Sequence, residues 1–375
     1  MIQVKDFYNE LLKNNINFFT GVPDSLLKDI CAYITDNADK NRNIITANEG
    51  GAIGLACGYH LATNNIPLIY MQNSGIGNSV NPLLSLADKE VYSIPMLLMI
   101  GWRGEPDIKD EPQHVKQGRI TLNLLDAMEI PYIIIDGDSD FISDLTEILK
   151  ICKKESKPVA LLIRKNTFGP YKLQNIQTNT SQLSREETLE NILSFIPENS
   201  VIVSTTGMLS RELFEIREKI GGNHSCDFLT VGSMGHASQI ALGIAIAKPN
   251  INVFCFDGDG ALLMHLGSIG IIGSVAPQNF KHIVFNNGSH DSVGGQPTIA
   301  LEINLVDIAK SVNYKYVNKV ISSESLKDNV SELCKEQGPG FLEIQIKKGS
   351  RKDLGRPTST PFENKLSLMN ELMKR

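Results

Sequence analysis

The chain has 375 residues, a length that predicts about two domains, each large enough to bury a hydrophobic core. Hydrophobic residues make up 42% of the chain and charged residues 21%, which is typical of a globular protein and excludes a largely disordered one. The formal net charge of −6 argues against non-specific binding to nucleic acid, although it is compatible with a local site for an anion.

The N-terminal half alternates between helical and strand-like segments. We expect helices over 3–14, 24–35 and 50–62 and strands at 17–20, 43–47, 67–71, 95–100, 131–135 and 158–163, with helical patterns between the later strands. Short apolar strands separated by helices predict a parallel sheet covered on both faces.

The stretch 168–183 interrupts this alternation. It is polar, contains Gly169-Pro170 and has no amphipathic period, so we interpret it as a linker between domains. Beyond it we expect helices over 184–195, 208–219, 236–247, 261–273, 304–312 and 324–336 and strands at 200–204, 226–230, 251–256, 280–286 and 340–346. The predicted organisation is one α/β domain at 1–167, a linker at 168–183, a second α/β domain at 184–355, and a tail at 356–375 that ends in a short helix.

The six cysteines form no CxxC pair and lie mostly in apolar surroundings, such as Phe254-Cys255-Phe256. We expect buried thiols in a reducing cytoplasm rather than disulfides. The first 15 residues lack the apolar core of a signal peptide, and no stretch approaches the roughly 18 apolar residues that a membrane span needs. We therefore expect a cytoplasmic protein with no membrane partner.

The strongest chemical signal lies at the ends of two strands. One strand leads into Gly258-Asp259-Gly260-Ala261, and the next ends in Asn286-Asn287-Gly288-Ser289. Because ligands bind at the carboxyl ends of parallel strands, we expect Asp259 and Asn287 at the same edge, where carboxylate and amide oxygens suit Mg²⁺. Gly258 and Gly260 would let a diphosphate approach the backbone at a helix N-terminus. The alternative is two ordinary turns, Asp-Gly and Asn-Gly.

A GDG sequence followed some 25 to 30 residues later by NN is the signature of thiamine-diphosphate-dependent enzymes, and the chain resembles this family. The resemblance implies that Asp259, the side chain of Asn287 and the carbonyl of Ser289 hold Mg²⁺ against the cofactor diphosphate. The choice of the second asparagine follows the family pattern, because the spacing alone does not decide it.

Two further stretches match the diphosphate-binding half of the family. In Gly232-Ser233-Met234-Gly235, Met234 matches the large apolar side chain that supports the bent cofactor, although a buried Met is ordinarily core. Thr206-Gly207, after the strand at 200–204, is a further predicted diphosphate contact.

The pyrimidine-binding half requires a glutamate at a strand end, and Glu49 matches it by opening a helix of small residues. Taken alone, Glu49 would only complement the helix dipole. The resemblance implies a hydrogen bond with N1′ of the cofactor pyrimidine, which promotes the tautomer that deprotonates the thiazolium C2. The stretch 73–78, NSGIGN, is a weak match to a dinucleotide fingerprint, so we interpret it as a backbone turn in which Ser74 and Gly75 contact the cofactor.

Two loops of the first domain indicate the substrate. Residues 20–28 contain Asp24, a predicted proton-transfer or orienting group whose alternative role is a helix N-cap. Residues 100–115 are long and charged and follow a strand end, as functional loops often do. We predict four substrate-binding residues, three in this loop and one in the second domain: Arg103, Lys109, His114 and His290. The alternative for the loop is a run of solvated charges.

Both loops, and the stretch 287–298, resemble the phosphonopyruvate decarboxylases, which lack the middle domain of larger relatives. The resemblance implies thiamine-diphosphate- and Mg-dependent conversion of 3-phosphonopyruvate to phosphonoacetaldehyde and CO₂ in phosphonate biosynthesis. It also implies a homodimer or homotetramer with the active site between subunits. The alternative is a sulfopyruvate decarboxylase or another 2-oxo acid decarboxylase. A dehydrogenase or kinase would need a complete GxGxxG or P-loop motif, and the sequence contains neither.

Overall fold

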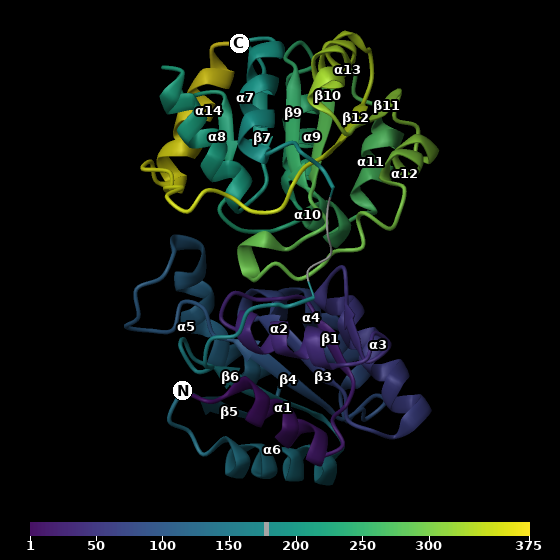
Figure 1. The fold of residues 1–375 in the computed structure, drawn as a ribbon, viewed down its shortest axis with the longest axis vertical. Helices are drawn as coiled ribbons and strands as arrows, with labels where there is room; N and C mark the ends of the chain where they lie inside the picture. Colours follow the sequence, from purple (N-terminus) through teal and green to yellow (C-terminus); the bar gives the residue numbers. More distant parts are fainter. Residues whose placement is uncertain (176–179) are drawn as a thin grey trace. The chain divides into compact units, whose positions relative to one another are not determined.

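The computed structural model describes residues 1–175 and 180–375, which form two compact units (Figure 1). The first unit comprises Met1–Gln177 and His290–Pro297, and the second comprises Thr178–Ser289 and Thr298–Arg375. Each unit is an α/β domain built on one six-stranded parallel sheet, so the expected fold class is confirmed.

The first sheet has the strand order β2-β1-β3-β4-β6-β5. Its strands are β1 (Phe19–Gly21), β2 (Asn43–Ile45), β3 (Leu68–Gln72), β4 (Met96–Gly101), β5 (Tyr132–Ile135) and β6 (Pro158–Ile163). Alternate residues point to opposite faces: Leu68 and Tyr70 enter one apolar cluster, whereas Ile69 and Met71 enter another. Both faces are therefore buried beneath helices, as the apolar strand sequences predict.

The helices of the first unit are α1 (Val4–Lys13), α2 (Lys28–Asn37), α3 (Glu49–Thr63), α4 (Ile76–Pro82), α5 (Pro112–Ala127) and α6 (Phe141–Glu155), with a 3₁₀ turn η1 (Asn73–Gly75) before α4 and a π-helical segment η2 (Leu83–Ala87) after it. The expected backbone turn at 73–78 is thus wrong, because this segment is 3₁₀ and then α-helical. The expected helix at 24–35 begins only at Lys28, since Asp24–Leu27 form a turn closed by the N–H of Leu27 to the carbonyl of Asp24 (3.2 Å).

The second sheet has the order β11-β12-β10-β9-β7-β8. Its strands are β7 (Val201–Ser204), β8 (Asp227–Leu229), β9 (Val253–Gly258), β10 (Phe280–Asn286), β11 (Tyr316–Val320) and β12 (Gly340–Gln345). The helices are α7 (Arg185–Phe195), α8 (Met208–Lys219), α9 (Ala237–Ala247), α10 (Asp259–Met264), α11 (Ser268–Val275), α12 (Leu305–Ser311), α13 (Ser323–Lys335) and α14 (Pro361–Met373), with a 3₁₀ turn η3 (Asp291–Val293). The strand β11 is not among the expected elements, and the helical stretches expected over 261–273 are α10 and α11.

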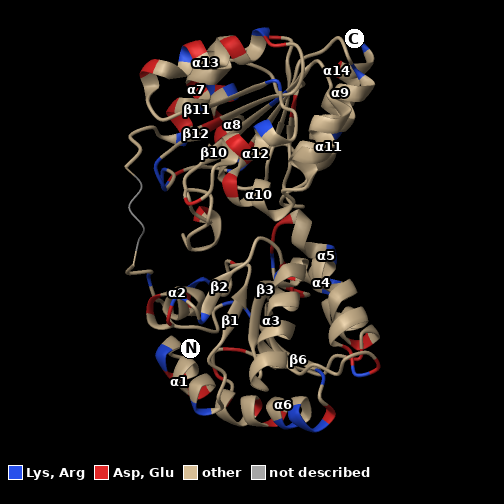
Figure 2. Ribbon diagram, turned by 90° about the vertical axis from the view of Figure 1, so that its right-hand side faces the viewer, with Lys and Arg blue, Asp and Glu red and all other residues tan. Residues whose placement is uncertain are grey.

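The two sheets differ in the number of charged residues on their strands. Figure 2 marks Lys and Arg in blue and Asp and Glu in red along the described chain. None of the strands described in the first sheet contains Asp, Glu, Lys or Arg. The second sheet, in contrast, carries charged side chains that are buried within it: Asp227, Asp257, Lys281 and Glu343. Buried charges need partners, and these make ion pairs or hydrogen bonds, such as Lys319 Nζ to Glu343 Oε1 at 3.0 Å.

The segment interpreted as a linker contacts both units at its ends. The backbone N–H of Tyr171 donates to Asp29 Oδ1 (2.9 Å) within the first unit. Beyond the gap, Ser181 Oγ donates to the carbonyl of Gln345 (2.7 Å) within the second. The middle of the expected linker, residues 176–179, lies outside the described residues.

The cysteines are free among the residues described, and five of the six are buried, as expected for small hydrophobic side chains. Burial raises the pKa of the Cys152 thiol to about 12, so this thiol is unreactive at neutral pH. No helix in the described part of the chain combines the length and the apolar character needed to cross a membrane.

Candidate functional site

The carboxyl ends of β1, β3, β4 and β6 meet at one edge of the first sheet, because these strands are parallel neighbours. The segments that leave this edge contain most of the first-domain residues singled out from the sequence. Parallel sheets of this kind bind ligands at this edge, so it is the candidate site of the first unit.

Glu49 is the first residue of α3, and the Asn48 side chain caps that helix by accepting the N–H of Gly51 (2.8 Å). The Glu49 side chain is only 5% exposed, and its Oε2 accepts a hydrogen bond from Asn78 Nδ2 at 2.7 Å. A Cβ atom on Gly75 would collide with the Glu49 carboxylate, so glycine is needed there for this carboxylate to lie where it does. The carboxylate is therefore oriented from two sides.

Asp24 is fully buried and lies in a hydrogen-bonded chain across the strand ends. Gln72 Nε2 donates to Asp24 Oδ1 (2.6 Å), and Ser74 Oγ donates to Gln72 Oε1 (2.8 Å). The N–H of Leu26 donates to Asp24 Oδ2 (2.9 Å), which is a turn contact, whereas the N-cap of α2 is Leu27. The alternative role of Asp24 as a helix N-cap is therefore wrong.

Burial raises the pKa of Asp24, although its bonds from Gln72 and Leu26 and the charge of Arg103 act in the opposite direction. A raised pKa keeps this carboxyl protonated to a higher pH than an exposed aspartate. Asp24 is thereby suited to hold and release a proton at the strand ends.

Arg103 follows β4 and is held in a fixed orientation. Its Nε and Nη2 donate to the two carboxylate oxygens of Asp110 at 2.8 and 2.5 Å, and its Nη1 donates to Ser25 Oγ at 2.7 Å. The hydrogen bond with Asp110 raises the pKa of the guanidinium. Burial alone would raise the pKa of Asp110, but bonds from Arg103 and from the N–H groups of Glu111 and Gly104 hold it below its usual range.

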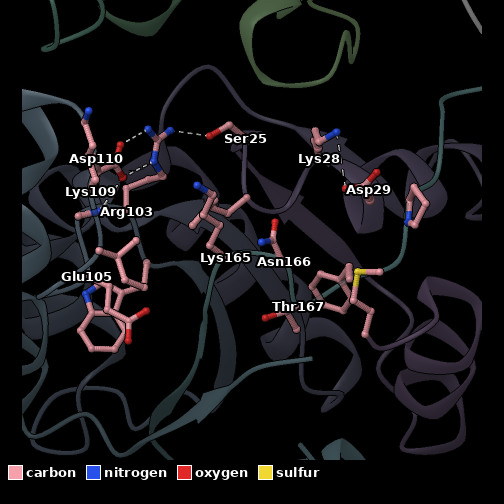
Figure 3. Close-up of a pocket in the computed structure, with 17 residues that line it drawn as sticks. Ser25, Lys28, Asp29, Arg103, Glu105, Lys109, Asp110, Lys165, Asn166 and Thr167 are labelled. Atoms are coloured by element: carbon pink, nitrogen blue, oxygen red, sulfur yellow. Dashed lines mark hydrogen bonds and ion pairs between the residues drawn. The ribbon is translucent and has the colours of Figure 1, made fainter. Parts of the chain in front are cut away.

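A pocket of about 460 Å³ opens beside this ion pair (Figure 3). Segments that follow β1, β4 and β6 line it, and it contains four cationic and three acidic side chains, namely Lys28, Arg103, Lys109, Lys165, Asp29, Glu105 and Asp110. Lys109 is an exposed residue of this pocket, whereas His114 is buried in the first turn of α5 and does not line it.

The candidate site of the second unit lies where β9 and β10 end. Gly258 of β9 is paired with Phe285 of β10, so Asp259 and Asn287 leave adjacent strands at the same edge. Asp259 is buried at the start of α10, and its Oδ2 accepts a hydrogen bond from Thr298 Oγ1. The spacing of the GDG and NN sequences thus corresponds to two neighbouring strand ends, as expected.

The two asparagines of the NN sequence have different environments. Asn286 is fully buried: its amide donates to Glu343 Oε1 (2.8 Å) and to the carbonyl of Ala300 (3.0 Å), and its Oδ1 accepts the N–H of Gly288 (3.1 Å). These bonds give Asn286 a structural role. The neighbouring Asn287 is also buried, and its Oδ1 accepts the N–H of Ser289 at 2.9 Å.

The donor atoms at this edge fit a divalent metal bound to a diphosphate. Asp259 and Asn287 offer carboxylate and amide oxygens, and Ser289 Oγ is buried without a hydrogen-bond partner among the described residues. An unpaired buried hydroxyl is costly unless a ligand satisfies it. Gly258, Gly260 and Ala261 lie at the start of α10, where there is little side-chain bulk. The N–H groups at a helix N-terminus are suited to bind an anion.

The other predicted residues of the second domain lie at strand ends or in loops. Gly207 has φ +104° at the N-cap of α8, directly after the half-buried Thr206. In the turn after β8, Ser233 has φ +53°, and Gly235, with φ +86°, lies so close to His265 that a Cβ atom would collide with it. Gly232 and Met234 of the same turn are partly buried. His290, which was expected in the second domain, is also partly buried, but the structure assigns it to the first unit, before η3.

Four polar residues at these edges are absent from the expectations: Gln72, Asn78, Asp110 and Thr298. Each contacts a predicted residue. Gln72 and Asp110 lie close in the sequence to one such partner, Ser74 and Arg103, whereas Asn78 and Thr298 lie far from theirs. The sequence feature that could have identified such residues is a polar side chain at or just beyond a strand end, which alone is a weak indication of a functional site.

Comparison with known proteins identifies both domains. Residues 3–130 match the "thiamine pyrophosphate enzyme, N-terminal TPP binding domain", and residues 205–344 match the corresponding "C-terminal TPP binding domain". The chain belongs to the thiamine pyrophosphate enzymes. Its cofactor is accordingly thiamine diphosphate, the same compound under its other name.

The similar proteins with assigned activities are decarboxylases. The phosphonopyruvate decarboxylase of Streptomyces viridochromogenes is 33% identical, covering 97% of this chain and 93% of that protein. The phosphonopyruvate decarboxylase of Streptomyces hygroscopicus is 31% identical over 97% and 92%, and the sulfopyruvate decarboxylase of Methanosarcina acetivorans is 26% identical over 91% and 90%. This thiamine pyrophosphate enzyme is therefore a 2-oxo acid decarboxylase, a carboxy-lyase.

Proposed function

We propose that the enzyme converts 3-phosphonopyruvate to phosphonoacetaldehyde and CO₂, with thiamine diphosphate and Mg²⁺, in phosphonate biosynthesis. The similarity to two phosphonopyruvate decarboxylases along 97% of the chain supports this substrate. The cationic pocket next to Asp24 is the structural feature that supports it, because the substrate carries a phosphonate at the end remote from its 2-oxo acid group.

In this proposal, Asp259, Asn287 and the carbonyl of Ser289 hold Mg²⁺ at the end of the second sheet. The diphosphate lies against the glycine-rich starts of α8 and α10, with Thr206, Gly207, Gly258 and Gly260 beside it. Thiamine diphosphate held there would supply a carbon nucleophile for the 2-oxo group and an acceptor for the electron pair left by CO₂. In the turn 232–235, Met234 supports the cofactor through its apolar side chain.

Glu49 and Asp24 have the proton-handling roles in this proposal. Glu49 forms the hydrogen bond with the cofactor pyrimidine, and Asn78 keeps its carboxylate in that orientation. Asp24, whose pKa is raised by burial, delivers a proton to the former keto carbon after CO₂ has left. Ser74 and Gly75 contact the cofactor near Glu49, and His290 assists in binding the substrate, whereas the buried His114 has no part in it.

The decisive experiment compares CO₂ release from 3-phosphonopyruvate, sulfopyruvate and pyruvate with added thiamine diphosphate and Mg²⁺. We expect the highest kcat/KM for 3-phosphonopyruvate. A preference for sulfopyruvate would replace the proposed substrate, since a relative with that activity is also similar to this chain. Turnover of pyruvate alone would contradict a role for the cationic pocket in substrate choice.

We also propose a homodimer or homotetramer in which Glu49 of one subunit and Asp259 of another complete each active site. The test mixes two inactive variants, Glu49→Gln and Asp259→Ala, under conditions in which subunits exchange. Random pairing in a dimer restores an intact pair of residues in about a quarter of the sites if the sites are shared between subunits. If each site is formed within one chain, the mixture stays inactive.

A further inference from the structure

The charges of the pocket beside Arg103 are unevenly paired. Each of its three carboxylates already has a partner: Asp110 binds Arg103, Glu105 Oε1 lies 2.8 Å from Arg164 Nε, and Asp29 accepts the N–H of Tyr171. Lys109 and Lys165, in contrast, form no ion pair with any residue that the structure describes. The pocket therefore has unneutralised positive charge from two ammonium groups.

Arg103 alone does not account for binding of a doubly charged anion. Its charge is balanced by Asp110, so the pair together is neutral, although the guanidinium still has two N–H donors besides the three that bond to Asp110 and Ser25. These donors provide orientation. The net charge needed to attract a dianion must come from lysines.

The backbone of Arg103 is also fixed. Asn73 Nδ2 donates to the carbonyl of Arg103 (2.8 Å), and the N–H of Arg103 donates to Asn73 Oδ1 (3.2 Å). The same amide donates to Thr121 Oγ1 of α5 at 2.9 Å. An arginine held at both its backbone and its guanidinium is preorganised, so little entropy is lost when a ligand binds to it.

Lys165 comes from a different strand end. It follows β6, the neighbour of β4, and in Figure 3 its side chain extends toward the part of the pocket where Arg103 and Ser25 lie. Ser25 is adjacent to Asp24 in the chain. The cationic side chains of the pocket therefore lie beside the residue that follows Asp24, although Asp24 itself is buried and does not line the pocket.

We propose that Lys165, together with Arg103 and Lys109, binds the distal tetrahedral oxyanion of the substrate; this inference rests on the proposed function. Arg103 orients the oxyanion, and the two lysines supply the charge. Two free ammonium groups favour a phosphonate dianion over a sulfonate, which carries a single negative charge. Lys165 is thus a specificity-determining residue for the phosphonate.

The first test uses the protein without cofactor and methylphosphonate as the probe. Trp102 is the only tryptophan of the chain, it lines the pocket, and its indole Nε1 donates to the carbonyl of Gly118, so its fluorescence reports on this site. We expect Lys165→Gln to weaken methylphosphonate binding about 10-fold or more, the loss of one charge-assisted hydrogen bond, and Lys165→Arg to retain most of it. Lys153→Gln, on the exposed end of α6, is the matched control and should bind as the wild type does.

The second test measures kcat/KM for 3-phosphonopyruvate and pyruvate. The proposal requires Lys165→Gln to lower the ratio of the two values, chiefly through KM for the phosphonate. Equal losses for both substrates, or unchanged methylphosphonate binding, would overturn it. If the wild type binds methylphosphonate through Lys165 but releases no CO₂ from 3-phosphonopyruvate, the oxyanion site stands and the proposed substrate fails.

Discussion

The edges of the two sheets, each of which carries candidate site residues, are built in opposite ways. At the first edge, polar side chains from separate elements bond to one another above strands that carry no charge, as in the chain Ser74–Gln72–Asp24. At the second edge, two short contiguous sequences supply the functional atoms, and buried polar residues inside the sheet support them. Lys319 binds Glu343, which accepts a bond from Asn286 next to the proposed metal ligand Asn287.

This difference agrees with the ligands that we propose for the two edges, a metal and a diphosphate at the second and the cofactor ring and substrate at the first. A metal and a diphosphate are recognised by backbone groups, glycines and a few oxygen ligands, all of which a strand-to-helix turn provides locally. Orienting a ring and transferring protons requires side chains placed from several directions, so the first edge is assembled from distant parts of the chain. We expect variants of the second edge to affect cofactor binding, and variants of the first edge to affect turnover.

The largest effect is expected for Asp259→Ala. Removal of the only carboxylate from the proposed ligand set should abolish Mg²⁺-dependent retention of thiamine diphosphate and, with it, activity. Calorimetric titration of the variant with the cofactor, with and without Mg²⁺, measures this. Asp328→Ala, on the exposed face of α13, is the matched control. Unchanged cofactor retention in Asp259→Ala would exclude Asp259 as a metal ligand.

Glu49→Gln should separate turnover from binding. The amide still fills the space beside Gly75, so we expect a folded protein that retains cofactor, whereas kcat falls by about 10²- to 10⁴-fold because the proton-handling group is lost. Steady-state kinetics at saturating cofactor measures the fall in kcat, and circular dichroism checks that the variant is folded. Glu147→Gln on α6 is an exposed control. A variant with full activity would remove Glu49 from the mechanism.

Thr298→Val should have an intermediate effect at the second edge. The Thr298 hydroxyl donates to Asp259 Oδ2, and loss of such an outer contact typically weakens metal binding about 10- to 100-fold. We therefore expect a higher Mg²⁺ concentration for half-maximal activity and recovery of kcat at saturating Mg²⁺. If kcat remains low when Mg²⁺ is saturating, Thr298 acts on something other than the metal.

The same contrast explains what could be predicted from the sequence. Asp259 and Asn287 were recognisable because their motifs are contiguous and lie directly after apolar strands. Asn78 was not recognisable as a partner of Glu49, since 29 residues separate them and only the packing of α4 beside α3 brings them together. Even the helical nature of 73–78 depends on that packing, because its glycines and asparagines are poor helix formers.

Charge patterns were similarly ambiguous. The cations of the loop 100–115 predict an anion site, but only the structure shows that Asp110 neutralises Arg103. The positive charge that attracts the anion is therefore proposed to come from lysines. Lys165 had no motif around it. Lys165 becomes a candidate only because β6 pairs in parallel with β4, which places the ends of both strands at one edge of the sheet.

The smallest effect that we predict is a pH dependence of stability at the first edge. Because burial raises the pKa of Asp24, the folded state binds this proton more tightly than the unfolded state does. The contribution of Asp24 to the free energy of unfolding is thus fully present below its unfolded pKa. It declines as the pH rises toward its folded pKa, by at most about 1.4 kcal/mol per pH unit. Asp24→Asn lacks this dependence, so the wild type should lose stability relative to the variant as the pH rises above the pKa of an unfolded aspartate, about 3.9. Urea unfolding followed by Trp102 fluorescence measures the difference, since this tryptophan lies in the first unit.

A difference that stays constant with pH would mean that Asp24 is ionised as readily in the folded state as in the unfolded one, and its role as the proton donor would have to be abandoned.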